Sequence, residues 1–395
     1  MPDQTAGGST APLGALTLLS GDAQAFLTKV WATTVHVHRG DPLPLTGLLT
    51  FDDVDELLTG TAIRTPAVRV ARDGQVLAPS TYTRHATLAG QPLSGLVDPA
   101  RIFTLVEEGA SVVLQGLHRY WRPLGALVAD LELALGHPCQ ANAYLTPPGS
   151  QGFAVHEDSH DVFVFQTHGS KLWEVHPPRG QDGEPSTVLL EPGVSMYLPT
   201  GTPHAARAQQ DVSLHVTIGI NQLTWRPVVE RALTAALGGG GDEHLPAGWL
   251  EEPALLADGL ADRLEALAAA VRSLEPAAVA DMELRRFLTG RTLWQRGGLR
   301  DRVGLDSLAD DTLLVRRPGH PCVLRPEGER LRVLLGDRDL VVPARLAGAL
   351  ERVRAAGALR PGDLADLLDG QSRLVLCRRL VREGLLTLAT GDDGP

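Results

Sequence analysis

Lysine is almost missing from this chain. Of its 395 residues 36 are basic, yet only Lys29 and Lys171 are lysines, and arginine supplies the rest. The sequence therefore uses arginine almost everywhere that a positive charge is wanted. A lysine within a strand-rich stretch indicates a place that needs a compact ammonium group rather than a planar guanidinium.

Cysteine and long apolar runs are scarce as well. Cys139, Cys322 and Cys377 lie far apart in no CxxC pattern, which argues against a thiolate metal site and predicts a reducing compartment. No apolar run reaches the roughly 18 residues that a membrane helix requires. The opening stretch MPDQTAGGSTAPLGAL lacks the basic start and apolar core of a signal peptide. These absences predict a cytoplasmic protein that does not enter a membrane.

The charge is negative and unevenly spread. The formal net charge is -11 and the pI is about 5.6. Residues 301–395 hold 15 acidic and 15 basic side chains, so the whole acidic excess lies in residues 1–300. This balance argues against nucleic acid as the main partner and is compatible with a basic protein or peptide partner.

The first half of the chain mixes helical and strand-like segments. Its length exceeds what a single core usually holds, so we expect two or three domains. Helical periodicity marks residues 23–31 and 123–136, and AVRVARDGQVL predicts a hairpin around Asp73-Gly74. From 141 to 222 short β-rich runs alternate with turn residues, which predicts a barrel or a sandwich.

A flexible junction is expected at the glycine run Gly238–Gly241. Beyond it, residues 255–276 predict a helix with an apolar stripe. The stripe consists of Leu256, Leu260, Leu264, Leu267, Val271 and Leu274. It indicates either packing within the chain or a helix that forms a dimer.

The C-terminal part, residues 311–395, is expected to form a small unit of strands and short helices that looks like a winged helix. Its last predicted helix carries Arg373, Arg378, Arg379 and Arg382. Both a DNA-reading helix and an ordinary solvated helix have this composition. The zero net charge of residues 301–395 favours the solvated helix.

Residues 156–161, HEDSHD, are the densest polar cluster in the strand-rich segment. In an extended strand His156 and Asp158 point to one face and Glu157 to the other. Two histidines and one carboxylate on one face of a metal, with open positions opposite, are typical of non-haem Fe(II) oxygenases. A third ligand is therefore required.

His204 is the best candidate for that ligand. It ends the pattern Pro-x-Gly-x-x-His in EPGVSMYLPTGTPHAARA, 46 residues beyond Asp158. An isolated HxD is more often a surface pair, but this His-bearing turn in the same strand-rich stretch makes a cupin-type metal site the better interpretation. Four other histidines are expected to be structural or adjacent to the site: His160, His168, His176 and His215.

Lys171 begins the strand-like run KLWEV directly after the first metal motif. An ammonium group there suits a carboxylate in a confined pocket. The alternative is chance, since two lysines must lie somewhere.

The stretches NAYLTPPGSQGFAVHEDSHDVFVFQTHGSKLWEV and MYLPTGTPHAA resemble the JmjC-type cupins of the ribosomal oxygenase group. The resemblance implies an α+β fold in three parts. A double-stranded β-helix (jelly-roll) oxygenase domain would occupy residues 1–225. A helical dimerisation region would occupy 226–300, and a C-terminal winged helix 301–395. It also implies Fe(II), 2-oxoglutarate and O2 as metal, cosubstrate and oxidant.

The same resemblance assigns roles to individual residues. His156, Asp158 and His204 match the iron ligands, which are also the catalytic centre. Four residues match contacts to 2-oxoglutarate: Asn142 near its iron-bound end, Tyr144 and Lys171 at its distal carboxylate, and Thr217 as a weaker match. Gly219 stands where the family can show a small hydroxyl residue, which puts a contact there in doubt.

The implied function is hydroxylation of a protein or peptide side chain, with histidine or arginine of a ribosomal protein as the leading candidate and a homodimer as the leading assembly. One alternative is an oxygenase that acts on another peptide or on a small metabolite. Another is a metal-containing cupin that senses a ligand and uses the winged helix as its output.

Overall fold

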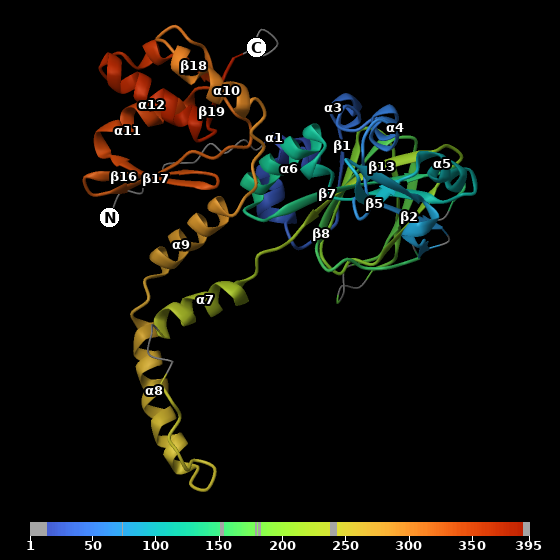
Figure 1. Cartoon of the computed structure of the whole chain (residues 1–395). Coiled ribbons are helices and arrows are strands. Elements are labelled where there is room, and N and C mark those ends of the chain that lie inside the picture. Colours follow the sequence, from blue (N-terminus) through green and yellow to red (C-terminus); the bar gives the residue numbers. More distant parts are fainter. Residues whose placement is uncertain are drawn as a thin grey trace. The chain divides into compact units, whose positions relative to one another are not determined.

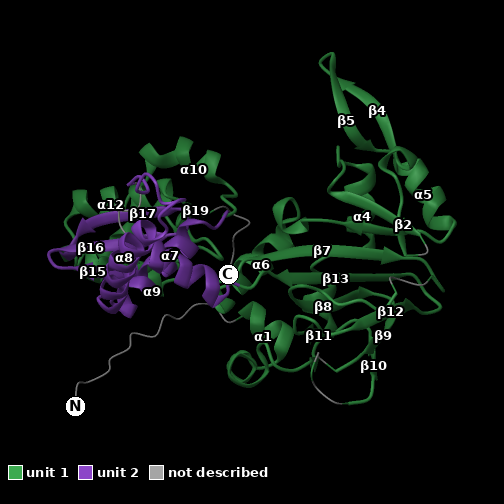
Figure 2. Ribbon diagram, turned by 90° about the horizontal axis from the view of Figure 1, so that it is seen from below, with its two compact units in different colours: residues 1–222, 293–323, 345–395 green, residues 223–292, 324–344 purple. Residues whose placement is uncertain are grey.

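The computed structural model describes residues 14–72, 74–150, 154–177, 180, 183–237 and 243–389. Asp73 of the expected hairpin turn and the glycine run Gly238–Gly241 lie outside the described residues. The chain divides into two compact units (Figure 2). The first unit comprises residues 1–222, 293–323 and 345–395, and the second comprises 223–292 and 324–344.

An eight-stranded sheet, whose strands differ in length, lies at the centre of the first unit. Its strands in spatial order are β1 (His36–Arg39), β11 (Val194–Leu198), β8 (Asp161–His168), β13 (Ser213–Ile220), β7 (Cys139–Thr146), β6 (Ser111–Leu114), β2 (Val68–Arg72) and β3 (Gln75–Val76). Every neighbouring pair is antiparallel. Arg72 pairs with Gln75 across the turn, so the predicted hairpin of β2 and β3 is confirmed.

A second, three-stranded sheet consists of β10 (Ser186–Leu190), β9 (Lys171–Val175) and β12 (His204–Ala208). It packs on one face of the large sheet through a small apolar cluster. That cluster includes Val164 and Met196 from the large sheet and Trp173, Leu190 and Ala206 from the small one. The strand-rich segment predicted over 141–222 is therefore confirmed.

Helices cover the opposite face of the large sheet (Figure 1). The helices of this part are α1 (Gly14–Ser20), α2 (Ala23–Ala25), α3 (Pro42–Thr46), α4 (Phe51–Thr59), α5 (Pro99–Glu107) and α6 (Arg122–Leu135). α2 continues as one π-helical turn, η1 (Phe26–Val30), so the helices predicted over 23–31 and 123–136 are confirmed. A two-stranded hairpin, β4 (Thr83–Leu88) and β5 (Gln91–Val97), extends from this unit.

Aromatic side chains anchor this helical face to the sheet. The rings of Phe26 and Phe163 lie 5.2 Å apart, and the ring of Tyr197 lies 4.9 Å from Phe26 and 5.1 Å from Phe163. All three side chains are at most 1% exposed. These rings therefore pack on the helix-covered face of β8, and the opposite face of β8 is directed toward the small sheet.

The second unit contains α7 (Trp225–Leu237), α8 (Ala254–Arg272), α9 (Pro276–Thr289) and a three-stranded sheet of β15 (Val323–Glu327), β16 (Arg330–Leu335) and β17 (Arg338–Pro343). The helix predicted over 255–276 is confirmed as α8. None of its residues is buried, and Leu260 and Leu264 of the apolar stripe are 50% and 55% exposed. Within the described residues the stripe thus lacks an apolar surface that covers it.

The C-terminal part of the first unit has a small sheet of β18 (Ala358–Leu359), β14 (Leu314–Arg316) and β19 (Leu386–Leu388), with α10 (Gly298–Gly304), α11 (Ala347–Ala355) and α12 (Gly370–Arg382). The winged-helix interpretation of this part stays a prediction. Three of the four arginines of α12 already have partners within the chain: Arg373 pairs with Asp310, Arg378 donates to the carbonyls of Leu305 and Leu308, and Arg379 pairs with Glu383.

Cys139, Cys322 and Cys377 are all buried, and none of them forms a disulfide. In the described part of the chain, no helix combines the length and the apolar character needed to cross a bilayer.

The ring cluster behind β8 should dominate the stability of the first unit. We expect Phe163→Ala to lower the free energy of unfolding by about 3–5 kcal/mol, because it removes a fully buried ring and leaves a cavity. Leu88→Ala, which alters a side chain that is 69% exposed on β4, should change it by less than about 0.5 kcal/mol. Urea unfolding of both variants measures this, and equal values for the two would contradict the packing described here.

Candidate functional site

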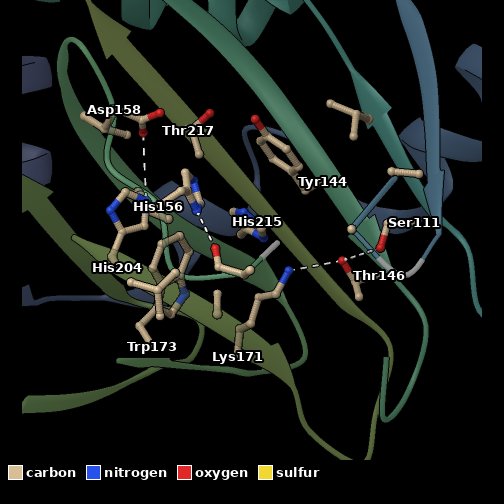
Figure 3. A pocket seen from close by; sticks show the side chains of 18 of the residues that line it. Ser111, Tyr144, Thr146, His156, Asp158, Lys171, Trp173, His204, His215 and Thr217 are labelled. Atoms are coloured by element: carbon tan, nitrogen blue, oxygen red, sulfur yellow. Dashed lines mark hydrogen bonds and ion pairs between the residues drawn. The ribbon is translucent and has the colours of Figure 1, made fainter. Parts of the chain in front are cut away.

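His156, Asp158 and His204 come together at one end of the space between the two sheets. One potential ligand atom from each lies within 4.8 Å of the other two. The Nε2 atom of His204 is 3.8 Å from a carboxylate oxygen of Asp158 (Figure 3). His204 is 4% exposed, whereas His156 is exposed to solvent. The cluster predicted from HEDSHD and the Pro-x-Gly-x-x-His turn is therefore present, with one side open.

Backbone carbonyls fix the tautomers of both histidines. The Nδ1 atom of His156 lies 2.9 Å from the carbonyl of Ala154, and that of His204 lies 2.9 Å from the carbonyl of Thr202. A carbonyl only accepts hydrogen bonds, so each Nδ1 carries a proton, and the neutral form of each ring offers the Nε2 lone pair to a metal. Burial lowers the pKa of His204, which also favours its neutral form. Two neutral imidazoles and one carboxylate suit a divalent first-row metal ion.

The backbone holds the two ligand-bearing segments together. His156 and His204 form an isolated antiparallel bridge, with N–H to O distances of 3.0 and 2.8 Å in the two directions. The backbone N–H of Gly201 donates to the carbonyl of Asp158 at 3.0 Å. His156 and Asp158 therefore sit on extended chain before β8 rather than inside a strand, and the bridge replaces the strand pairing that their spacing indicated.

Asp161, the last residue of HEDSHD, secures the turn that precedes His204. Its carboxylate is 1% exposed and accepts hydrogen bonds from the Thr200 backbone N–H at 2.8 Å and from the Thr200 hydroxyl at 2.7 Å. It also accepts hydrogen bonds from the Tyr197 hydroxyl and the Gln222 amide. These contacts compensate its desolvation, so this acid orients the site and does not face a ligand.

A cavity of about 500 Å³ extends from the cluster between the sheets (Figure 3). Side chains from both sheets and from the segment before β8 line it. Its polar and aromatic lining residues are Arg69, Ser111, Tyr144, Thr146, His156, Asp158, Lys171, Trp173, His204, His215 and Thr217.

Lys171 lies away from the metal cluster, toward Thr146 and Ser111 (Figure 3). It is 3% exposed, and its ammonium group donates to the Thr146 hydroxyl at 3.1 Å, which in turn lies 3.2 Å from the hydroxyl of Ser111. It forms no ion pair with any described acid. Burial lowers the pKa of Lys171 to about 8. A buried ammonium group without a counter-charge is costly, and a carboxylate in the cavity would compensate it.

Aromatic side chains separate the two ends. The rings of Tyr144 and His215 stack in parallel, 4.9 Å apart, and the Trp173 ring meets His215 edge to face at 5.6 Å. Burial raises the pKa of Tyr144 and, together with the charge of Lys171, lowers the pKa of His215 well below its usual range. Tyr144 therefore keeps its proton and His215 is neutral. The indole Nε1 of Trp173 and the Nδ1 of His215 are buried and lack hydrogen-bond partners among the described residues.

The residues expected to contact a cosubstrate are not all in the cavity. Tyr144, Lys171 and Thr217 line it, as expected. Asn142 does not: it lies on the same strand face as Tyr144, but its side-chain oxygen accepts a hydrogen bond from the Gly116 N–H at 3.0 Å. Its proposed contact near the metal therefore lacks support from the geometry.

The other histidines separate into two groups. His215, expected to be structural or adjacent, lines the cavity. His160 packs against Gly219, where a Cβ would come within 2.7 Å of its imidazole, so the missing side chain at 219 makes room for that ring. His168 contacts the Phe51 ring and His176 pairs with Glu174, and neither lines the cavity.

The sequence interpretation missed Arg69, Ser111, Thr146 and Trp173. Thr146 follows Tyr144 by two residues on β7, so strand alternation alone could have placed it on the same face. Arg69 and Ser111 come from β2 and β6, which reach the cavity only because of the strand order of the large sheet. Nothing in their local sequence indicates that.

Comparison with known proteins agrees with this geometry. Residues 127–228 match the JmjC domain family. The chain is 32% identical to human ribosomal oxygenase 1 over 240 residues, which is 56% of this chain and 36% of that protein. It is 34% identical over 175 residues to the bifunctional lysine-specific demethylase and histidyl-hydroxylase NO66 of Dictyostelium discoideum, covering 38% of this chain and 33% of that one. The matches thus span about a third of the length of these curated relatives.

The fold likeness is broader. The structure of YcfD, a ribosomal oxygenase from Escherichia coli in complex with cobalt and 2-oxoglutarate, aligns with a TM-score of 0.53 at 18% identity. The alignment covers 93% of this chain and 98% of that chain. Another structure of the same protein gives a TM-score of 0.56 at 17% identity. Residues 127–228 thus match the JmjC domain family, the fold of strands and helices is like that of YcfD, and the chain resembles the ribosomal oxygenases.

Proposed function

We propose that this protein is an Fe(II)- and 2-oxoglutarate-dependent oxygenase that hydroxylates a side chain of a protein or peptide. One observation carries the proposal. One cavity is lined by a His-Asp-His cluster whose two Nδ1 atoms face backbone carbonyls and by a buried lysine that has no counter-charge among the described residues.

The donor set fits the metal. His156, Asp158 and His204 would hold Fe(II) and leave positions free on the cavity side, as in 2-His-1-carboxylate oxygenases. When bound, the iron supplies the redox chemistry by which O2 and 2-oxoglutarate oxidise a C–H bond. The YcfD structure with cobalt and 2-oxoglutarate supports a metal and this cosubstrate in the same fold.

The distance between the two ends suits a five-carbon dicarboxylate. His204 on β12 pairs with Val175 on β9, and Lys171 lies on β9 four residues before Val175. Four residues of extended chain span about 13 Å between Cα atoms, and both side chains reach inward from there. Lys171 and the protonated Tyr144 hydroxyl would bind the distal carboxylate by charge-assisted hydrogen bonds. The rings of Trp173 and His215 would exclude water along the path, and Thr217 would border it.

The substrate proposal follows the relatives. The names ribosomal oxygenase and histidyl-hydroxylase favour a ribosomal protein, modified on histidine or arginine. The acidic excess in residues 1–300 suits a basic partner of this kind.

The remaining assignments are proposals too. We propose an oxygenase domain over residues 1–225, a dimerisation region over 226–300 and a winged helix over 301–395. The exposed leucines of α8 support a homodimer through that helix. Nucleic-acid binding is not favoured, because three of the four arginines on α12 are engaged within the chain. A cytoplasmic location would agree with three cysteines that form no disulfide.

Succinate formation tests the function directly. We expect the purified protein with Fe(II), ascorbate and 2-oxoglutarate to form succinate, and ribosomal proteins to stimulate this turnover and gain 16 Da in a peptide. Turnover without stimulation would point to another peptide or a metabolite. No turnover from iron-loaded protein would contradict the oxygenase and favour a ligand sensor.

The metal ligands are tested by Asp158→Ala. Loss of the only carboxylate in the cluster should reduce both Co(II) affinity and 2-oxoglutarate turnover by at least ~100-fold. The adjacent substitution Glu157→Ala is the matched control and should leave both near the wild-type values. Metal titration by visible absorption and succinate assays give the two readouts. Full activity of Asp158→Ala would overturn the ligand assignment.

The lysine predicts a pH dependence of 2-oxoglutarate binding. Because the pKa of Lys171 is lowered to about 8, its ammonium group is charged below that pH and loses its charge above it. The affinity of zinc-loaded protein for 2-oxoglutarate should therefore fall about tenfold between pH 7 and pH 9. Lys171→Arg stays charged throughout and should show weaker but nearly constant affinity. Calorimetry at several pH values measures this, and a wild-type profile as flat as that of the arginine variant would place the anchor elsewhere.

A further inference from the structure

The cavity extends sideways, away from the line between Lys171 and the metal cluster. Arg69, Ala71 and Gly74 line it from β2 and the following turn, and Ser111 and Val113 line it from β6. These residues form a side region, which we call the β2–β6 lobe. Arg69 pairs with Val113, and Val113 pairs with Tyr144, so Arg69 lies two strands beyond the tyrosine in the same row. Two strand spacings amount to about 10 Å.

Arg69 brings a positive charge into this lobe, and no partner for it is found among the described residues. Its Nε atom is buried and has no hydrogen-bond acceptor among the described residues, and the side chain makes no ion pair with any described acid. By contrast Arg72, three residues further along β2, does not line the cavity and pairs with Glu108 at 2.7 Å. An arginine whose charge served only solubility would resemble Arg72.

The charges of the filled site would leave Arg69 uncompensated. Asp158 is the only acid that lines the cavity among the described residues. A divalent metal and Lys171 together balance Asp158 and the two carboxylates of 2-oxoglutarate. One positive charge then remains, at Arg69, within a partly dehydrated lobe. Such a guanidinium favours a carboxylate, which it can bind through two parallel hydrogen bonds, and it disfavours a second cation.

We propose that the β2–β6 lobe is a substrate subsite in which Arg69 binds a carboxylate of the target molecule. This inference rests on the proposed function, because it takes 2-oxoglutarate to occupy the Lys171 end. The target then presents an acidic side chain or a terminal carboxylate close in space to the histidine or arginine that is oxidised, and this carboxylate enters the lobe while the oxidised residue faces the metal. An arginine or lysine side chain does not enter this lobe. Arg69 thereby determines specificity, and it takes no part in holding the metal.

Ligand binding to metal-loaded protein tests this without knowledge of the natural target. Full-length protein is loaded with Zn(II) and saturated with 2-oxoglutarate, which it cannot turn over with zinc. Three small probes are then titrated by ligand-observed NMR: the N-acetyl, N-methylamide derivatives of aspartate, asparagine and arginine. We expect the aspartate probe to bind at least about tenfold more tightly than the other two, as a charge-assisted hydrogen-bond pair requires.

Arg69→Met should remove this preference, and the matched control Arg72→Met should keep it. The 2-oxoglutarate affinity should stay within twofold in both variants, which also shows that they are folded. The wild-type comparison of the three probes decides the question even if Arg69→Met does not fold.

The inference is overturned if the wild-type protein shows no preference for the aspartate probe, or if the preference survives Arg69→Met. It is also overturned if Arg69→Met weakens 2-oxoglutarate binding as Lys171→Met does, since Arg69 would then belong to the cosubstrate. Failure of zinc-loaded wild-type protein to bind 2-oxoglutarate would refute the proposed function and this inference together. If wild-type protein binds 2-oxoglutarate but shows no preference for the aspartate probe, only the subsite is refuted.

Discussion

The site depends on one short backbone contact, the antiparallel bridge between His156 and His204. The two residues come from segments 48 positions apart, and each would be an ordinary surface or strand histidine without the other. The bridge brings their rings to a centroid distance of 4.5 Å. Because the carbonyls of Ala154 and Thr202 each bind an Nδ1 atom, the same local backbone that forms the bridge also sets both tautomers. Geometry and protonation are thus determined together.

Desolvation is the constraint that shapes the rest of the cavity. Each polar group placed between the sheets loses its hydration. The chain supplies hydrogen-bond partners to some of these groups and leaves others without enough of them. Asp161 has four hydrogen-bond donors and is fully compensated, so it acts as a structural anchor. Among the described residues Lys171 has only the Thr146 hydroxyl as a partner, and Trp173 Nε1 has none. Groups that are buried but not compensated carry the functional information, because a ligand is what would satisfy them.

This distinction explains how far the sequence could be interpreted. The metal cluster was predictable because its spacing reflects local geometry: two residues apart on extended chain, and a histidine after a tight turn. Lys171 stood out through composition, since the chain hardly uses lysine elsewhere. The strand-rich segment and the helices at 123–136 and 255–276 followed from periodicity. The side chains that depend on strand order were not predictable, and Arg69 and Ser111 are examples.

Asn142 shows the opposite limit. Its position two residues before Tyr144 correctly places it on the same face of β7, yet its side-chain oxygen accepts a hydrogen bond from the Gly116 N–H. Strand periodicity predicts only the face of the strand to which the Asn142 side chain points. Its hydrogen-bond partner, Gly116, lies in a loop whose position the periodicity does not predict. The same holds for Gly219, whose missing side chain has a clear structural consequence only once the His160 ring is seen to lie against it.

The proposed chemistry and the proposed selectivity lie in different parts of the chain. The metal cluster, Lys171, Tyr144 and Trp173 all lie within residues 127–228, the segment that matches the JmjC domain. The β2–β6 lobe comes from residues 69–113, outside that segment. Substitutions in β2 and β6 can therefore change the charge and volume of the lobe without altering any metal ligand or the lysine anchor. Similarity within the matched segment therefore informs on the proposed reaction, whereas the proposed subsite adds a separate constraint on the target.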